Sequence, residues 1–293
     1  MKYLLVAEIA EKWNISERSV RNYCAKGRVK GAFLEGKTWK IPENALKPER
    51  SYKKKHSITL LDILKAEKKN KYTGGIYHKT QIDLTYNSNH IEGSHLTHDQ
   101  TRYIFETNTI RIENGVLNVN DIIETVNHFR CVDMIIDDAK AALTEKFIKK
   151  LYLILKNVTN DWFSVGDYKK LPNEVGGMPI ALLEEVADKM KILLAEYNEK
   201  KEKTLEDILD FHVKFESIHP FQDGNGRVGI LIMFKECLKY NIVPFIIDDD
   251  LKMFYYRGLK QWNNEKGYLT DICLTAQDKY KEYLDYFRID YSR

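Results

Sequence analysis

The chain has 293 residues, of which 43% are apolar and 30% charged, a composition typical of soluble globular proteins. No run of about 18 apolar residues is present, and acidic residues interrupt the apolar start, so we expect neither a membrane span nor a secretory signal. The four cysteines are far apart in the sequence and form no CxxC pair. This spacing predicts reduced thiols in a cytoplasmic protein rather than disulfides or a zinc site.

The formal net charge of +3 is unevenly distributed along the chain. Residues 1–57 carry 14 Lys and Arg against 6 Asp and Glu, a balance of +8, and the remainder has a balance of −5. A basic head on a mildly acidic body predicts two modules that bind different partners.

The first 47 residues predict a small domain of helices and a hairpin. Apolar residues at helical spacing indicate a helix over 4–13. Ser16 is expected to cap the N-terminus of a second helix, which ends before Gly27. Two short strands then flank a turn centred on Gly36. This stretch resembles the excisionase-like or MerR-like DNA-binding domains, which implies a winged helix-turn-helix.

The second helix of this domain presents Arg18, Arg21 and Lys26 outward. A helix with several basic side chains can lie in the major groove while a hairpin touches phosphates, so we expect DNA binding through these residues. The alternative is a helical module that binds protein and has a merely solvated basic face. Residues 48–57 are polar, charged and without periodicity, and predict a linker.

Residues 58–293 predict one mainly helical domain, because strand-like stretches are scarce and no fixed repeat appears. Helices are expected over 58–69, 78–92, 97–106, 119–141, 144–157, 180–200, 204–217, 227–240, 251–264 and 269–288.

The stretch HPFQDGNGRVGI, residues 219–230, is a glycine-rich turn between two of these helices. Gly224 and Gly226 allow an anion to approach the amides of a helix start, and Arg227 adds a fixed positive charge. Asp223 would repel bare phosphate, so its presence implies a bridging cation, which we expect to be Mg²⁺. His219 is suited to act as general base for a hydroxyl. Together these residues predict group transfer at phosphorus.

HPFQDGNGR matches the motif of the Fic family, HPFx(D/E)GNGRxxR, at every specified position through Arg227. The resemblance implies a Fic-fold helical domain that transfers AMP from ATP to a Ser, Thr or Tyr hydroxyl of a target protein. It implies a base at His219, a magnesium ligand at Asp223 and a buried anchor at Phe221. It also implies phosphate contacts from Gly224, Asn225, Gly226 and Arg227.

Two further stretches resemble parts of that family. DYKKLPNEVGGMPI has Gly176 and Gly177 as a hairpin turn signal, so we expect a β-hairpin flap near 168–180 whose residues 170–178 line the groove for the target. The alternative is an ordinary loop. Tyr256 and Asn263 are seven residues apart and would share one helical face, which suits an aromatic plane and an amide that hold adenine. A core role for the tyrosine is the alternative.

SNHIEG, residues 88–93, resembles the family's inhibitory motif, [ST]xxxE[GN]. Ser88 and Glu92 are four residues apart on a helix expected near 85–93, and Gly93 is suited to end it. The resemblance implies that Glu92 restrains the activity of its own chain. A plain helix end with a capping glycine is the alternative.

The last motif position departs from the family, which usually has arginine where this chain has Ile230. In relatives that arginine contacts either the γ-phosphate of ATP or the inhibitory glutamate. We therefore expect a weaker inhibitory clamp and the loss of one charge-assisted contact, worth about 1.5–3 kcal/mol.

Three functions follow as hypotheses. The first is a magnesium-dependent protein adenylyltransferase that also labels itself and binds DNA. The second is a DNA-binding regulator whose Fic domain only senses a nucleotide, and the third is a Doc-type phosphotransferase. The intact GNGR favours the first over the third, and the intact His219 and Asp223 favour it over the second. A homo-oligomer is possible, although no heptad pattern indicates one.

Overall fold

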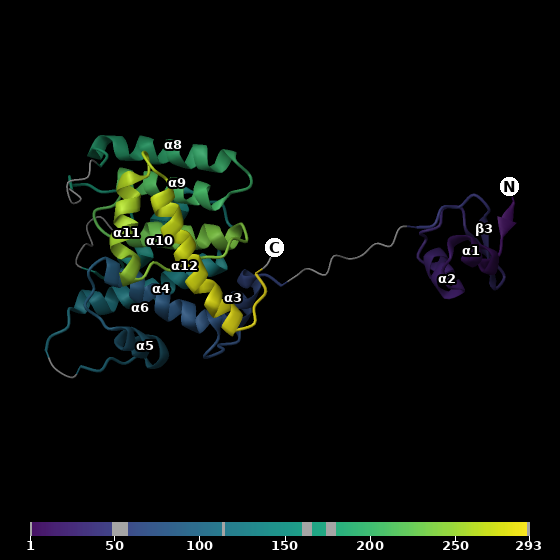
Figure 1. Cartoon of the computed structure of the whole chain (residues 1–293), viewed down its shortest axis with the longest axis horizontal. Helices are drawn as coiled ribbons and strands as arrows, with labels where there is room; N and C mark the ends of the chain where they lie inside the picture. Colours follow the sequence, from purple (N-terminus) through teal and green to yellow (C-terminus); the bar gives the residue numbers. More distant parts are fainter. Residues whose placement is uncertain (1, 49–57, 113–114, 160–165, 174–179, 292–293) are drawn as a thin grey trace. The chain divides into compact units, whose positions relative to one another are not determined.

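The computed structural model of the chain describes residues 2–48, 58–112, 115–159, 166–173 and 180–291. The chain divides into two compact units, Met1–Ser57 and Ile58–Arg293, which are described separately (Figure 1). Among the described residues, no helix is both long enough and apolar enough to cross a membrane. The linker expected over 48–57 lies, after Pro48, outside the described residues.

The small unit begins with two helices joined by a tight turn. Helix α1 (Val6–Trp13) ends at Asn14, which adopts a left-handed conformation with φ of 51°. Helix α2 (Glu17–Ala25) follows Ser16, whose hydroxyl accepts a hydrogen bond from the Ser19 amide and so caps the helix. The left-handed Asn14 and the capping Ser16 thus define the turn between the two helices.

A three-stranded antiparallel sheet completes the small unit. Strands β2 (Phe33–Glu35) and β3 (Thr38–Pro42) form the expected hairpin, and Gly36 supplies the positive φ of 61° that its turn requires. Strand β1 (Tyr3–Leu4), which the sequence did not indicate, pairs with the other edge of β3. Their common core consists of Val6, Ile9, Ala10, Trp13, Val20, Cys24, Val29 and Ile41. That this unit is a winged helix-turn-helix domain stays a prediction.

The regular secondary structure of the large unit is helical within its described residues, as expected. Its elements are α3 (Leu60–Lys69), α4 (Ile76–Ile91), α5 (His98–Thr107), α6 (Val119–Asp137), α7 (Glu145–Leu155), η1 (Leu183–Glu185), α8 (Val186–Glu199), α9 (Leu205–Ile218), α10 (Asn225–Lys239), α11 (Asp249–Gln261) and α12 (Gly267–Tyr286). Each helix predicted from the sequence is present, with ends that shift by a few residues and with the start of 180–200 replaced by η1.

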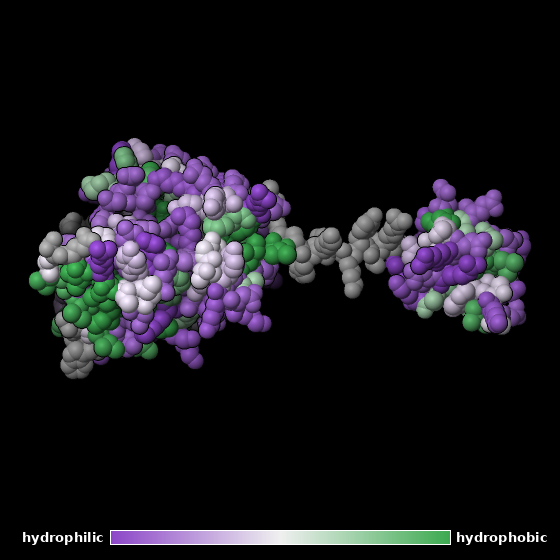
Figure 2. Space-filling model, turned by 90° about the horizontal axis from the view of Figure 1, so that it is seen from below, coloured by the Kyte–Doolittle hydropathy of each residue, from purple (hydrophilic) through white to green (hydrophobic). Residues whose placement is uncertain are grey.

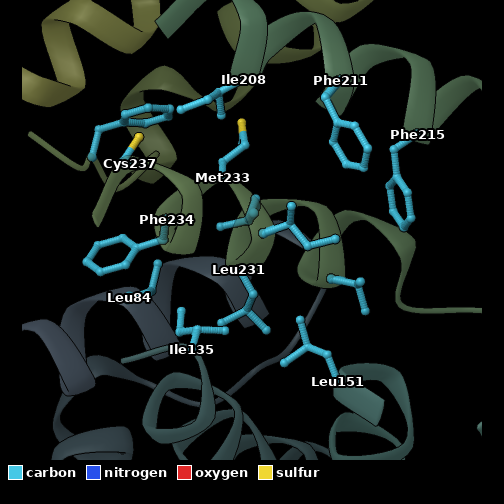
Figure 3. Packing of buried hydrophobic residues seen from close by; sticks show 14 of the residues in the cluster. Leu84, Ile135, Leu151, Ile208, Phe211, Phe215, Leu231, Met233, Phe234 and Cys237 are labelled. Carbon is cyan, nitrogen blue, oxygen red and sulfur yellow. The ribbon is translucent and has the colours of Figure 1, made fainter. Parts of the chain in front are cut away.

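Helix α10 forms the centre of this unit. Every residue from Arg227 to Leu238 is buried, and the helix packs against α4, α6, α7 and α9. In Figure 3, Leu231 of α10 points toward Ile135 of α6, and Met233 points toward Ile208 of α9. Because it is enclosed on all sides, α10 holds its N-terminal end in a fixed place relative to the surrounding helices.

The surface contrasts with this interior. Figure 2 shows hydrophilic side chains over most of the visible face of the large unit, with hydrophobic areas between them. The expected flap near 168–180 falls partly outside the described residues, because 174–179 are not among them. Its described part, residues 168–173 and 180, contains no strand.

Candidate active site

The motif loop leaves α9 through a left-handed residue. His219 has φ of 50° and ψ of 61°, and its amide donates to the Phe215 carbonyl at 2.9 Å, which ends the helix. Phe221 is fully buried, with its ring stacked on Tyr152 at a centroid distance of 3.9 Å. The loop is therefore anchored to α7, and Phe221 occupies the buried position that the sequence predicted for it.

Asn225 closes the loop on itself. Its Oδ1 accepts a hydrogen bond from the Phe221 amide at 2.8 Å, and its Nδ2 donates to the Phe221 carbonyl at 2.9 Å. The side chain is buried, and both ends of its amide are used within the loop. Asn225 thus shapes the loop in this structure. Gly224, with φ of 76°, provides the left-handed residue from which α10 starts.

Four charged side chains form a network beneath this loop. The ammonium of Lys156 lies 2.5 Å from Glu124 Oε1 and 2.5 Å from Asp223 Oδ2. The Arg227 guanidinium contacts Glu124 through Nη1 and lies 3.2 Å from Asp223 Oδ2 through Nη2. Two cations and two carboxylates therefore compensate one another in a largely buried cluster, the arrangement that buried charges require.

The network sets the protonation of its members. Burial opposes ionisation of Asp223, but Lys156 and Arg227 outweigh it and lower the pKa of that carboxyl. Burial would likewise lower the pKa of Lys156, yet Asp223 and Glu124 raise it. Asp223, Lys156 and Arg227 are consequently charged near neutral pH. The Asp223 side chain remains 51% exposed, while the Lys156 and Arg227 side chains are buried.

Asp223 is the residue that the sequence assigned to a magnesium ion. No group of three or more His, Cys, Asp or Glu residues suited to a metal ion exists among the described residues. A half-exposed single carboxylate next to a helix start instead fits a cation that is held mainly by phosphate oxygens, which is the usual environment of protein-bound Mg²⁺.

His219 is placed as a neutral imidazole. Burial is the main reason that its pKa falls to about 4, and the nearby ammonium of Lys169 lowers it further, while Asp223 opposes both. Its Nδ1 atom is buried without a hydrogen-bond partner among the described residues. An unprotonated ring nitrogen next to the loop is able to accept a proton near neutral pH.

Glu92 lies at the N-terminal end of α10. It follows the last residue of α4, and Gly93, with φ of 98°, turns the chain away. A Cβ atom on Gly226 would lie only 2.2 Å from Glu92 Oε1, so this carboxylate rests against the first turn of α10. Desolvation by the surrounding protein raises the pKa of Glu92, and the positive charge of Arg227 opposes that effect. Ser88 is buried one turn earlier, with its hydroxyl unpartnered among the described residues.

Ile230 packs into the hydrophobic core and is 5% exposed. Its side chain therefore contributes to packing and gives neither Glu92 nor a phosphate a charged partner. Glu92 itself makes no ion pair or hydrogen bond through its carboxylate within the described part of the chain.

Of the two residues expected to hold adenine, Tyr256 lies on helix α11 and Asn263 lies just after its end. The Tyr256 hydroxyl donates to the Ile91 carbonyl at 3.4 Å, which links α11 to the end of α4. Because Asn263 lies beyond the end of α11, the expectation that both residues share one face of a helix is not met. Asn263 instead lines a surface pocket of about 400 Å³ together with Ser217, Ile218 and Trp262, close in sequence to His219.

A second buried polar group lies behind the loop. A hydrogen bond of 2.5 Å joins His212 Nε2 and the Tyr255 hydroxyl. Glu216 Oε1 is buried without a hydrogen-bond partner among the described residues. Both side chains press against Gly229, where a Cβ atom would lie 2.6 Å from His212 and 2.8 Å from Glu216. Burial, reinforced by Glu92, raises the pKa of Glu216 to about 8.

In the small unit, Arg18, Arg21 and Lys26 are all exposed on or directly after α2. Arg21 forms an ion pair with Glu17 at 2.6 Å, one turn earlier in the helix. The residues are therefore accessible to a polyanion, but Arg21 would have to exchange its present partner.

Sequence reasoning missed Glu124, Lys156 and Glu216. Lys156 follows the apolar run LYLIL, and Glu124 lies on a different helix 32 residues earlier, so no local pattern joins them. Only the packing of α6 and α7 beside α10 brings these charges to the motif.

Parts of this chain are similar to known proteins. Residues 142–237 match the model of the Fic/DOC family. A protein adenylyltransferase Fic of Drosophila mojavensis is 26% identical over 68% of this chain and 38% of that protein, and the one of Drosophila melanogaster is 28% identical over 68% and 39%. The chain thus spans about two fifths of the length of these curated relatives. A Fic-domain-containing signalling protein from Bacteroides thetaiotaomicron shares the fold, with a TM-score of 0.63 and 24% identity over 80% of this chain and 98% of that chain.

Residues 142–237 of the large unit are therefore similar to a Fic/DOC family domain. The distant curated relatives of the chain are named as protein adenylyltransferases, and the solved neighbour shows the fold.

The charge network predicts that Lys156 is important for stability. Lys156→Met leaves Glu124 and Asp223 with one cation, so we expect the free energy of unfolding to fall by about 3 kcal/mol, the lower end for buried pairs because Asp223 is half exposed. Lys150→Met, at an exposed position of α7, should change it by less than about 0.5 kcal/mol. Urea unfolding followed by circular dichroism measures both. Equal stability of the two variants would contradict a stabilising network.

Glu216 predicts a pH-dependent stability. Because its pKa is raised from 4.5 to about 8, the folded chain retains a proton that the unfolded chain releases, and this group lowers stability as the pH rises between those values. Glu216→Gln should therefore gain stability over the wild type as the pH rises from about 5 to about 8, whereas the exposed control Glu199→Gln should not. Thermal unfolding at several pH values measures this. A difference that stays constant with pH would refute the assignment.

Proposed function

We propose that the chain is a protein adenylyltransferase that transfers AMP from ATP to a Ser, Thr or Tyr hydroxyl of a target protein and of itself. The observation that carries the proposal is the juxtaposition, in one rigid loop, of a helix start, the Asp223–Arg227 pair and a neutral His219. A polyphosphate, a cation and a hydroxyl each find a suitable group there.

The proposed reaction follows from these positions. His219 takes the proton of the hydroxyl, whose oxygen attacks the α-phosphorus of ATP. The bond between that phosphorus and the bridging oxygen to the β-phosphate breaks, and pyrophosphate leaves. A Mg²⁺ ion at Asp223 would neutralise phosphate charge. The amides at Gly224 and Gly226 and the guanidinium of Arg227 would hold the phosphates, for which Arg227 must share its contact with Asp223.

Two further roles belong to this proposal. Tyr256 and Asn263 would contact the adenine, which requires the tyrosine to exchange its bond to the Ile91 carbonyl or to offer only its ring face. Glu92 would restrain the reaction, because its carboxylate rests where the first turn of α10 favours an anion. A negative group at that place competes with phosphate oxygens for the same helix end.

The reaction is tested by intact-mass spectrometry of the full chain with ATP and Mg²⁺. Glu92→Gly should gain the mass of one adenylyl group faster than the wild type, because the competing carboxylate is gone. His219→Ala in that background should lose at least about 100-fold in rate, as expected for loss of a general base, whereas the exposed control His95→Ala should not.

The other outcomes identify the alternative functions. A gain of one phosphoryl group would indicate a Doc-type phosphotransferase. No gain in any variant would leave a DNA-binding regulator with a nucleotide-sensing domain, and transfer that persists in His219→Ala would overturn the role of the base.

We further propose that the small unit binds DNA through the exposed face of α2. In the full chain, replacing Arg18, Arg21 and Lys26 by alanine should weaken binding to a mixed-sequence duplex and reduce the slope of affinity against salt by up to about three. The control replaces the exposed Lys146, Lys150 and Lys189 of the large unit. Fluorescence anisotropy over a salt titration measures both, and identical curves for the two triple variants would exclude this face.

A further inference from the structure

The four charged side chains beneath the motif loop form a closed ring. The Lys156 ammonium donates to Glu124 Oε1 and to Asp223 Oδ2, each at 2.5 Å. The Arg227 guanidinium donates to the other oxygen of Glu124 and lies 3.2 Å from the same Asp223 Oδ2. Each cation therefore contacts both carboxylates and each carboxylate contacts both cations, so the ring has no net charge.

Burial distinguishes this ring from other ion pairs of the large unit. Lys149 and Lys68 also lie between two carboxylates, but their side chains are 26% and 21% exposed. The side chains of Lys156 and Arg227 are only 2% and 5% exposed, and Glu124 is largely buried. Because buried charges are screened much less by water and salt, the members of the ring must balance one another.

The fold holds the ring in place from two sides. Helix α6 supplies Glu124 and, one turn later, Asn127, whose Nδ2 donates to the carbonyls of the residues directly before and after Lys156, at 3.1 and 2.7 Å. The backbone that carries the lysine is thus fixed to the same helix as its carboxylate partner. A Cβ atom on Gly224 would lie 3.7 Å from Lys156 Cδ, so the lysine lies directly beneath the motif loop.

Asp223 is the open corner of the ring. Its side chain is half exposed, and the proposed function places a metal ion there. A polyphosphate that arrives without a metal ion meets the Arg227 guanidinium while two carboxylates compensate its charge. With a divalent cation at Asp223, Lys156 would still neutralise Glu124. The guanidinium would then be available to turn from carboxylate to phosphate.

We propose that Glu124 and Lys156 are specificity-determining positioning residues, which close the ring and thereby reserve the site for a nucleotide that brings a divalent cation. The proposal deepens the proposed function and rests on it for the identity of the nucleotide. Glu124 prevents Arg227 from offering its full charge to a nucleotide without a cation. Lys156 neutralises Glu124 once the guanidinium has left. Neither residue contacts the reacting atoms in this scheme.

The test measures the affinity for ATP by isothermal titration calorimetry, once with Mg²⁺ and once with EDTA. The full chain carries Glu92→Gly and His219→Ala throughout, so that the competing carboxylate is absent and the ATP is not consumed. Glu124→Gln, Lys156→Met and the combination of the two are compared in this background.

The two single substitutions should act in opposite directions on ATP binding in EDTA. Glu124→Gln gives the ring an excess positive charge and releases part of Arg227, so we expect metal-free ATP to bind about tenfold more tightly. Lys156→Met gives an excess negative charge and should weaken metal-free ATP about tenfold. Both changes should be smaller with Mg²⁺, because the ion neutralises part of the phosphate charge. The double variant leaves the neutral pair of Asp223 and Arg227 and should return to the starting affinities.

A purely structural role predicts a different result, in which both single substitutions weaken ATP binding equally with Mg²⁺ and with EDTA. That outcome would overturn the proposal, as would unchanged affinities in folded variants. The matched controls are Lys149→Met and Glu145→Gln, which open an ion pair of α7 that does not involve the motif. Equal effects in these controls would also overturn it. Where one single variant does not fold by circular dichroism, the direction of change in the other, and its reversal in the double variant, decide.

The binding measurement separates this proposal from the proposed function. The expected affinities without AMP transfer in the chain that retains His219 would reject the adenylyltransferase and keep the roles of Glu124 and Lys156. AMP transfer together with ATP affinities that Glu124→Gln and Lys156→Met leave unchanged would reject those roles alone. No binding of ATP in any variant would reject both.

Discussion

The start of helix α10 is the constraint on which the rest of the large unit depends. A helix whose every residue from Arg227 to Leu238 is buried cannot shift without opening the core, so its unpaired N-terminal amides are fixed in space. The loop before it is closed by Asn225 and anchored by Phe221 on Tyr152. Under the proposed function, chemistry at this point would require no rearrangement of the surrounding helices, only the exchange of side-chain contacts such as that between Arg227 and Asp223.

A buried helix start surrounded by charged side chains must balance its electrostatics. Lys156 and Arg227 would repel each other beneath the loop if Glu124 and Asp223 did not lie between them. The same carboxylates keep the two cations charged, which leaves the region suited to a polyphosphate once Arg227 turns from carboxylate to phosphate. Glu92 adds a carboxylate against Gly226, at the helix end where the proposed function would place phosphate oxygens.

Local patterns predicted the helices, the hairpin around Gly36 and the loop between α9 and α10, because periodicity, capping residues and glycine act over a few neighbouring positions. They did not predict β1, whose two residues pair with a strand nearly 40 positions away. For the same reason they missed Glu124 and Lys156, which reach the motif only through the packing of α6 and α7. Lys169 lay within the stretch assigned to the flap, but its burial and neutral partners are properties of the folded chain.

Ile230 shows how a departure from a motif is absorbed. An arginine at this enclosed position would need a buried anionic partner, whereas isoleucine adds apolar contact to the core and needs none. The consequence falls on Glu92, which has no cation bound to its carboxylate in the described part of the chain. The end of α4 is instead held from α11, where His90 lies 3.6 Å from Asp249 and the Tyr256 hydroxyl bonds to the Ile91 carbonyl. The position of Glu92 thus depends on contacts of its neighbours rather than on a partner of its own. We expect that displacement of Tyr256 from the Ile91 carbonyl would weaken the contact that holds the end of α4 beside α11.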